Sequence, residues 1–345
     1  MADNMSKAPL CMAPFSQMVF KPDGQTSPCC YLYQHDFGHI KEAHSIQQLF
    51  NGPRFRQIRS HFLAGRTPKI CRHHATYTKC YKNFEHLRSF DQEDLAQKQT
   101  KPPRRLDVRL NGRCNLSCVM CEIWQQPNGV YDGSVFWQKA PGEVFPYLES
   151  IEILGGEPFI QKDTFRLIEE ISAVNDRCRF SFVTNGHYHF SSGMKKRLDK
   201  IKIDTLHISV DSLTAETYAK IRKKGDLAVL KKNIESVYKY NLERKEGFSL
   251  VFSMVVLQEN RFEIEDFFAF AKAYGAKAQF QYAHYDPSFS QSLKFLSARE
   301  KKDYLDYLEG FFDGEKKAAL ASIKGPLFDE IKGAKLKGEM GEIPH

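Results

Sequence analysis

No stretch of the sequence is apolar over enough residues to cross a bilayer, which takes about 20 predominantly apolar residues. The first residues, Met1 to Met5, also lack the charged-then-apolar pattern of a secretory signal. We therefore expect a cytoplasmic protein without a membrane partner. In that compartment nine cysteines are better explained as metal ligands than as disulfides. None of them follows Cys178, which begins an apolar strand and is expected to be a buried structural thiol.

Length and charge give only broad bounds. A chain of 345 residues with 42% hydrophobic residues suggests about two globular domains. The net charge of +8 suits nucleic acid, an anionic peptide or no charged partner at all. The densest basic runs, 195–202 and 220–232, fall on predicted helices, where a solvated helix face explains them. No recognisable RNA-binding segment accompanies these runs, so a nucleic-acid partner is not expected.

One loop carries three cysteines, Cys114, Cys118 and Cys121, whose spacing lets their sulfurs converge on a single metal centre. A structural zinc site would normally be closed by four ligands. Nothing near the loop supplies the fourth. A [4Fe–4S] cluster also takes four thiolates as a rule, so three would leave one iron open to a substrate or cofactor. The loop alone leaves both metals possible and favours the cluster.

A second motif follows one strand later. Residues 150–154 read as a short strand, and Gly155, Gly156, Glu157 and Pro158 come at its end. Two glycines allow the backbone to approach a ligand closely, and a proline there suits the opening of a helix. Placed after a three-cysteine loop, this motif strengthens the interpretation of the loop as an iron–sulfur site.

These residues resemble the radical S-adenosylmethionine (SAM) superfamily. The resemblance implies that Gly155 to Pro158 bind the SAM amine and that Met120, where the family usually has an aromatic residue, lies near adenine. It also implies that SAM chelates the open iron and that an electron cleaves SAM to methionine and a 5′-deoxyadenosyl radical. A reducing partner such as flavodoxin or ferredoxin would supply that electron.

The rest of the chain alternates strand-like and helix-like stretches. Alternation of this kind predicts a parallel sheet with helices outside, and six units would form the partial (βα)6 barrel of the superfamily. From residue 297 the chain reads as helical, with an apolar stripe that includes Tyr304 and Leu308. The expected strands are 106–110, 150–154, 179–184, 205–210, 248–257 and 278–282, and the expected helices are 164–174, 193–200, 227–244 and 262–274.

Polar residues fall at the carboxyl ends of these strands, where barrels bind ligands. The third strand ends in Thr184 and Asn185, and the fourth places His207, Ser209 and Asp211 on one face. The resemblance implies that Ser209 and Asp211 bind the SAM ribose and that Val256, with Asn260, lies beside adenine. His207 is better explained as a satisfied interior histidine. No residue is assigned as a catalytic acid or base, although Tyr282, His284 and Cys30 are open candidates.

The N-terminal segment carries its own cysteines. A turn at Pro22 to Gly24 predicts a hairpin that brings Cys11 and Cys29 together, and Cys71 and Cys80 follow on a loop. This order resembles the auxiliary-cluster domains called SPASM and twitch, which implies that Cys11, Cys29, Cys71 and Cys80 hold a second [4Fe–4S] cluster. Cys30, His73 or His74 could take one of these ligand positions, and a zinc-stapled module is the alternative.

The resemblance therefore divides the chain into an auxiliary-cluster domain (1–90), a linker (91–103), a radical SAM barrel (104–286) and a helical extension (287–345). An auxiliary cluster held by four cysteines cannot bind substrate, so we expect it to accept an electron. The expected function is oxidative modification of a peptide or protein side chain by a radical SAM oxidoreductase. Alternatives are dehydrogenation or epimerisation of a sugar or aminocyclitol, RNA modification, and a non-catalytic metal-binding module.

Overall fold

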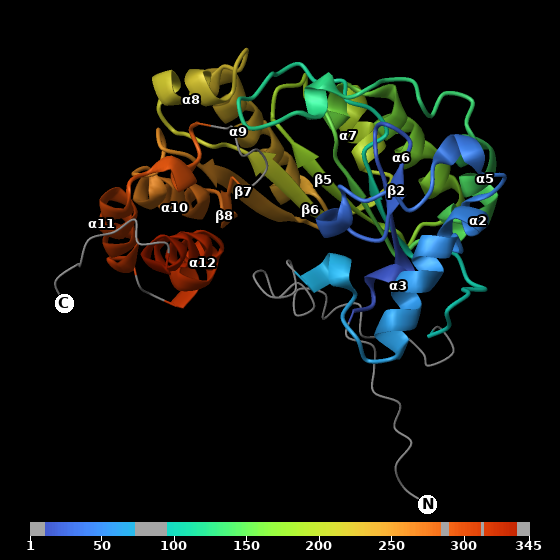
Figure 1. Cartoon of the computed structure of the whole chain (residues 1–345). Coiled ribbons are helices and arrows are strands. Elements are labelled where there is room, and N and C mark those ends of the chain that lie inside the picture. The colour runs from blue at the N-terminus through green and yellow to red at the C-terminus, as the bar shows by residue number, and fades with distance from the viewer. Residues whose placement is uncertain (1–10, 73–94, 284–289, 312–313, 337–345) are drawn as a thin grey trace, which may run out of the picture. The chain divides into compact units, whose positions relative to one another are not determined.

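The computed structural model of this chain describes residues 11–72, 95–283, 290–311 and 314–336 (Figure 1). The chain divides into two compact units, and each is built from several separate segments. Unit 1 comprises residues 1–114, 122–183 and 189–204, and unit 2 comprises residues 115–121, 184–188 and 205–345. The domain boundaries expected at residues 90, 103 and 286 stay a prediction.

Unit 1 contains β1 (Gln17–Phe20), β2 (Thr26–Ser27), β3 (Arg105–Val108), β4 (Ser150–Ile153) and all but the last residue of β5 (Arg179–Thr184). β1, β3, β4 and β5 pair in parallel in that order, and β2 lies antiparallel beside β1. One face carries Met18, Leu106, Ile151 and Phe180 in register, each at most 1% exposed. Side chains alternate between the faces of a strand, so the residues between these four lie on the opposite face.

Helices pack on one another along unit 1. α2 (Ile46–Phe50) contacts α5 (Val135–Glu143), α5 contacts α6 (Lys162–Val174), and α6 contacts α7 (Ser192–Leu198). In α6 the buried Leu167, Ile168 and Ile171 form the apolar stripe that a helix needs on the side facing a core. The other helical elements among the described residues of this unit are α1 (Ala13–Ser16), η1 (Cys30–Leu32), η2 (Ile40–Glu42), α3 (Pro53–Leu63), η3 (Lys69–Cys71), η6 (Ile123–Gln125), η7 (Phe145–Tyr147) and η8 (Pro158–Ile160).

Unit 2 contains most of β6 (Lys202–Ser209), together with β7 (Ser249–Val256) and β8 (Lys277–Tyr282), which pair in parallel. α12 (Gly314–Leu336) packs against β8 and against α11 (Ala298–Glu309). Tyr304 and Leu308 of α11 are buried, as the apolar stripe predicts. The other helical elements are α8 (Ala215–Ile221), α9 (Leu227–Glu243), α10 (Ile264–Ala273) and η9 (Leu293–Phe295).

The expected fold class is confirmed, because parallel strands alternate with helices and the C-terminal region is helical. Each expected strand and helix is present, with ends that move by a few residues. The sequence did not predict that β1 of the N-terminal hairpin would join the sheet beside β3. It also missed α5, whose interior Pro141 and Gly142 weaken the helical pattern. Within the described residues, no helix is long and apolar enough to cross a membrane.

Candidate functional site

The three-cysteine loop follows β3 and passes from one unit to the other. Cys114 belongs to unit 1, whereas Cys118 and Cys121 belong to unit 2, and all three are half-buried. In unit 2 the backbone N–H groups of Ser117 and Val119 donate to the carbonyls of Lys223 and Ile221, at 3.1 and 3.0 Å. The loop is thereby held by backbone hydrogen bonds, which do not depend on side-chain rotamers.

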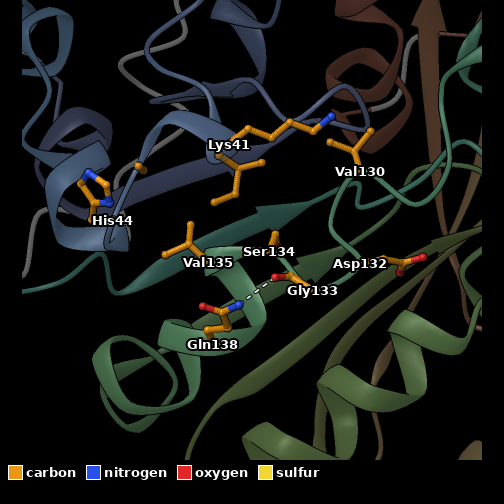
Figure 2. A pocket seen from close by; sticks show the side chains of 10 residues that line it. Lys41, His44, Val130, Asp132, Gly133, Ser134, Val135 and Gln138 are labelled. Atoms are coloured by element: carbon orange, nitrogen blue, oxygen red, sulfur yellow. Dashed lines mark hydrogen bonds between the residues drawn. The ribbon is translucent and has the colours of Figure 1, made fainter.

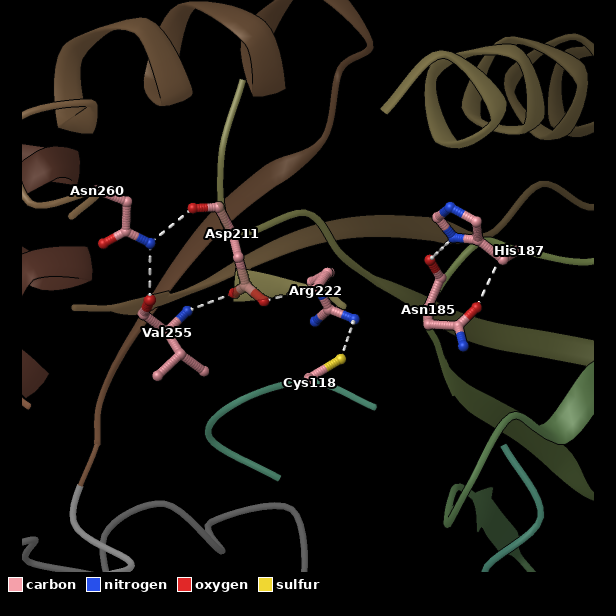
Figure 3. Close-up of polar contacts among 7 residues, drawn as sticks. All are labelled: Cys118, Asn185, His187, Asp211, Arg222, Val255 and Asn260. Atoms are coloured by element: carbon pink, nitrogen blue, oxygen red, sulfur yellow. Dashed lines mark hydrogen bonds and ion pairs between the residues drawn. The ribbon is translucent and has the colours of Figure 1, made fainter. Parts of the chain in front are cut away.

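A buried ion pair stands beside Cys118 (Figure 3). Arg222 Nε donates to Asp211 Oδ2 at 2.6 Å, and Arg222 Nη1 donates to Cys118 Sγ at 3.7 Å. The two charged side chains are 7% and 1% exposed. Burial alone would lower the pKa of Arg222, but Asp211 and Cys118 outweigh it and raise the pKa. Arg222 is therefore a permanent cation that donates to a thiol expected to bind a cluster.

Besides its ion pair with Arg222, Asp211 is held by two further hydrogen bonds. Its Oδ1 accepts from Val255 N at 2.7 Å, and its carbonyl accepts from Asn260 Nδ2 at 2.6 Å (Figure 3). Its backbone has a φ of 61°, a left-handed conformation that Asp and Asn tolerate better than most residues. The structure thus gives Asp211 a part in fixing Arg222, and its expected contact with the SAM ribose stays a prediction.

Apolar residues of the loop pack in the same unit. Val119 and Met120, together with Val255, contact a buried cluster of Ile221, Leu257 and Ala283. Met120 was expected near adenine, and this apolar surface suits the face of a base. Val256, the residue expected there from β7, is itself fully buried, whereas its neighbour Val255 is half-buried.

The polar residues after β5 support the loop. Asn185 Nδ2 donates to Asn115 Oδ1 at 2.9 Å, and Asn115 Nδ2 donates to the carbonyl of His187 at 2.6 Å. Thr184 Oγ1 accepts from Gly186 N at 3.1 Å. Ser209 is half-buried at the end of β6, in register with Ser253. These contacts place Asn185 at the loop, and SAM contacts by Thr184, Asn185 and Ser209 stay predictions.

In unit 1 the Gly155 to Pro158 motif packs against the base of the same loop. A Cβ on Gly156 would lie 2.0 Å from the carbonyl oxygen of Arg113, so only glycine fits. Gly155 has a φ of 123°. Glu157 N donates to the same carbonyl at 2.9 Å, and the buried Glu157 side chain accepts from Phe159 N. The close approach that the glycines permit is therefore to the residue before Cys114.

The N-terminal cysteines also gather within unit 1. Cys11 and Cys29 are half-buried and Cys71 is buried, and β1 and β2 form the expected hairpin. Burial raises the pKa of Cys29, and Cys30, Cys11 and Cys71 add to that rise, which requires these thiols to lie near one another. Cys80, His73 and His74 lie outside the described residues.

Cys30 faces different neighbours from Cys29. Solvent reaches its side chain, yet the protein around it limits its solvation and raises the pKa of the thiol to about 11. Asp107 and Glu152 act in the same direction, while Arg109 and Arg105 oppose them. Cys30 therefore lies close to charged side chains of β3 and β4 and to the segment that follows β3.

The cysteine donor sets fit iron–sulfur clusters. Across the described part of the chain, no three His, Cys, Asp or Glu side chains converge tightly enough to hold one metal ion. In a cubane cluster each thiolate binds a different iron, so the cysteines need not converge on one point. Thiols grouped in two places, one of them hydrogen-bonded to a buried guanidinium, suit such clusters.

One other predicted feature, His207, has a clear position. The interior His207 is hydrogen-bonded to Gln279, and burial lowers its pKa, as expected for a neutral, satisfied histidine. His284 lies outside the described residues. Sequence reasoning missed the contact of Arg222 with Cys118, because the two residues are 104 positions apart. It also missed the charged face of β3, although the alternation of Arg105, Asp107 and Arg109 could have revealed it.

A cavity of about 400 Å³ lies elsewhere in unit 1 (Figure 2). Its polar groups are of mixed charge, with Lys41 and His44 on one side and Asp132 on the other. It contains none of the residues predicted to bind SAM or a cluster. Its lining residues are Ile40, Lys41, Ala43, His44, Val130, Asp132, Gly133, Ser134, Val135 and Gln138.

The fold and the cysteine loops define a class of iron–sulfur protein, and comparison with known families identifies it. The model of the radical SAM superfamily matches residues 108–271, and that of SPASM, an iron–sulfur cluster-binding domain, matches residues 11–81. The chain therefore contains a radical SAM domain, and a SPASM domain precedes it at the N-terminal side. Its cofactors are accordingly [4Fe–4S] clusters and SAM.

Named relatives cover only part of the chain. It is 28% identical over 192 residues to a probable GTP 3′,8-cyclase of Methanothermobacter thermautotrophicus, covering 54% of this chain and 59% of the relative. It is 27% identical over 198 residues to a GTP 3′,8-cyclase of Clostridium botulinum, covering 54% and 58%. The chain thus spans less than two thirds of the curated relatives it matches.

Solved structures resemble the chain more distantly. Streptococcus suis SuiB bound to S-adenosylmethionine has a TM-score of 0.44 at 13% identity, covering 74% of this chain and 62% of that one. Native anSMEcpe with bound AdoMet has a TM-score of 0.44 at 21% identity, covering 68% of this chain and 62% of that one.

Proposed function

We propose that this protein cleaves SAM reductively and uses the resulting 5′-deoxyadenosyl radical to abstract hydrogen from its substrate. The hydrogen bond from Arg222 to Cys118 carries the proposal, because it places a buried cation at a cysteine of the three-cysteine loop. A [4Fe–4S] cluster bound there would supply the electron that splits SAM. Support for a productive site also comes from the backbone hydrogen bonds that fix Ser117 and Val119.

The chain's own residues would orient the cofactors. Cys114, Cys118 and Cys121 would hold the first cluster. Gly156 and Glu157 would stay fixed against Arg113, and this contact would set the position of the motif expected to bind the SAM amine. The apolar surface around Met120 would exclude water from the adenine. A flavodoxin or ferredoxin would be the reducing partner.

We further propose that Cys11, Cys29, Cys71 and Cys80 hold the auxiliary cluster. The proximity of Cys11 and Cys71 to Cys29 supports this set; Cys30, which also lies near Cys29, has charged side chains around it as well. Four cysteine ligands would leave that cluster without a position for substrate. It would then accept an electron from the substrate radical, and the outcome would be oxidative modification of a peptide or protein side chain.

The relatives named GTP 3′,8-cyclase favour a second candidate, the cyclisation of GTP. Arginine and lysine side chains are the usual partners of phosphate groups. On the charged face of unit 1, Arg109 pairs with Asp107 and Arg105 lies beside Glu152. These two arginines are therefore not free to bind a triphosphate.

Iron and acid-labile sulfide, measured after anaerobic reconstitution, test the two-cluster proposal. We expect about eight irons per chain, and about four in a variant with Cys114, Cys118 and Cys121 replaced by Ala. The wild type should form 5′-deoxyadenosine from SAM and the variant should not. Zinc without sulfide, or SAM cleavage by the variant, would refute the proposal. Stimulation of cleavage by GTP would select the cyclase activity.

A further inference from the structure

Two stretches of unit 2 run side by side at the three-cysteine loop. The backbone N–H groups on either side of Cys118 donate to the carbonyls on either side of Arg222, at 3.1 and 3.0 Å. Cys118 and Arg222 therefore occupy the position of a non-hydrogen-bonded pair in an antiparallel ladder, where facing side chains are closest. The backbone itself sets Arg222 against Cys118.

The side chain of Arg222 reaches the sulfur from this position. Nη1 donates to Cys118 Sγ at 3.7 Å, and Nε donates to Asp211 Oδ2 at 2.6 Å (Figure 3). Asp211 is fixed in turn, because its Oδ1 accepts from Val255 N at 2.7 Å. A guanidinium held at one nitrogen by a fixed carboxylate keeps its direction, so the bond to sulfur does not depend on a freely rotating side chain.

Fully buried residues flank this hydrogen bond. Tyr218 and Ile221, which precede Arg222 in the chain, are 0% exposed. The side chains of Arg222 and Asp211 are 7% and 1% exposed. Because water is excluded, a charge or a hydrogen bond acts more strongly here than at the surface. A change at either side chain of the pair will therefore be felt at the sulfur.

A hydrogen bond to a cysteine ligand affects the reduction potential of an iron–sulfur cluster. Reduction adds one electron, and the cysteine sulfurs share the added negative charge. A cationic donor therefore stabilises the reduced form more than the oxidised form, and the potential rises. Asp211 opposes this effect, because its negative charge offsets the positive charge of Arg222.

We propose that Arg222 raises the reduction potential of the [4Fe–4S] cluster held by the three-cysteine loop and that Asp211 limits the rise. The inference rests on the proposed function, and Arg222 acts in it through Cys118. One electron passes from the reducing partner, a flavodoxin or ferredoxin. No bond breaks and no proton moves in that transfer, because the guanidinium is already charged. The pair thus sets how strong a reductant must be to start SAM cleavage.

An anaerobic redox titration of the reconstituted protein without SAM, followed by electron paramagnetic resonance, measures this potential. The variant with Cys114, Cys118 and Cys121 replaced by Ala retains only the auxiliary cluster, so its signal shows which potential belongs to the loop. Lys220→Gln is the matched control. It removes a cation two residues from Arg222 whose side chain is 58% exposed, and it should titrate as the wild type does.

Variants of the pair are expected to shift the potential in opposite directions. Asp211→Asn leaves Arg222 without its counter-charge, so the equilibrium constant for reduction should rise at least tenfold, about 59 mV for a one-electron couple. Asp211→Asn combined with Arg222→Leu removes the donor and leaves the pair without net charge, as in the wild type, so the constant should fall at least tenfold. A looser or wetter site would move both variants in the same direction. A change below tenfold in either variant, or shifts of the same sign, overturns the proposal.

Arg222→Lys decides the question if one of these variants binds no iron at the loop. A single ammonium nitrogen cannot replace Nε and Nη1 at once, so pairing with Asp211 takes it away from Cys118. The equilibrium constant for reduction should then fall at least tenfold. A wild-type potential in Arg222→Lys overturns the proposal.

Iron content and 5′-deoxyadenosine formation, measured on the same samples, separate this inference from the proposed function. SAM cleavage by a wild type whose variants keep its potential overturns the inference and leaves the proposed function standing. The expected shifts in a protein that never cleaves SAM refute the proposed function and leave the assignment of Arg222 standing.

Discussion

The buried pair of Asp211 and Arg222 offers the sharpest test of the structure. Asn at position 211 tolerates the left-handed backbone and keeps an acceptor for Val255 N, so Asp211→Asn removes little except the charge. Arg222 then remains as an uncompensated cation that is 7% exposed. Breaking a buried pair in this way costs about 3–5 kcal/mol. We expect a loss of that size in the free energy of unfolding.

Urea unfolding of the metal-free protein, followed by circular dichroism, measures this loss. Glu216→Gln is the control, because it breaks the exposed pair of Glu216 and Lys220 on α8 and should leave the unfolding curve unchanged. Combining Asp211→Asn with Arg222→Leu removes the stranded cation and should recover part of the stability. A loss below about 1 kcal/mol in Asp211→Asn, or strictly additive losses in the double variant, would refute the reasoning.

Three further predictions follow from single residues. Gly156→Ala forces a Cβ against the backbone of Arg113, so we expect the free energy of unfolding to fall by about 2–4 kcal/mol and SAM cleavage to be lost. Gly142→Ala is the control: its Cβ meets no atom within 4 Å in α5, so it should stabilise the protein slightly. Equal unfolding curves for the two variants would contradict this reasoning. Cys178 is 1% exposed, and burial raises the pKa of its thiol to about 12, so mass spectrometry after iodoacetamide treatment at pH 8 should find it unlabelled until urea unfolds the chain. Because the pKa of Glu152 is raised, the folded state binds more protons than the unfolded state above pH 4.5, so stability falls as pH rises through that window. Glu152→Gln should therefore be more stable than the wild type at pH 7 and lose this advantage near pH 4. An advantage that does not change with pH would contradict the shift.

Local sequence patterns were sufficient to predict the strands and helices. The strand from Arg179 to Thr184 has the predicted bounds, because alternating side chains mark a strand without reference to its neighbours. The buried state of Cys178 followed from the apolar strand it begins. The three-cysteine loop and the Gly155 to Pro158 motif likewise identified the family, because their chemistry resides in adjacent residues.

The sequence was less informative where chemistry depends on partners. It placed Asp211 correctly at the end of a strand but gave no sign that Arg222 would reach both Asp211 and Cys118. It showed that Gly156 permits a close approach but not that Arg113 would be the group approached. In each case the partner is remote in the sequence or lies on another element, and no local periodicity encodes which groups packing will bring together.

The sequence alone thus determined the alternating α/β elements and the radical SAM domain, because spacing within one loop or one strand fixes them. Tertiary structure alone decided that β1 joins the sheet beside β3, and that Asp107 and Glu152 stand side by side on one polar face. Strand register determines both results. Shifting a strand by one residue would turn Glu152 to the apolar face, and only the packing of the whole sheet selects the register.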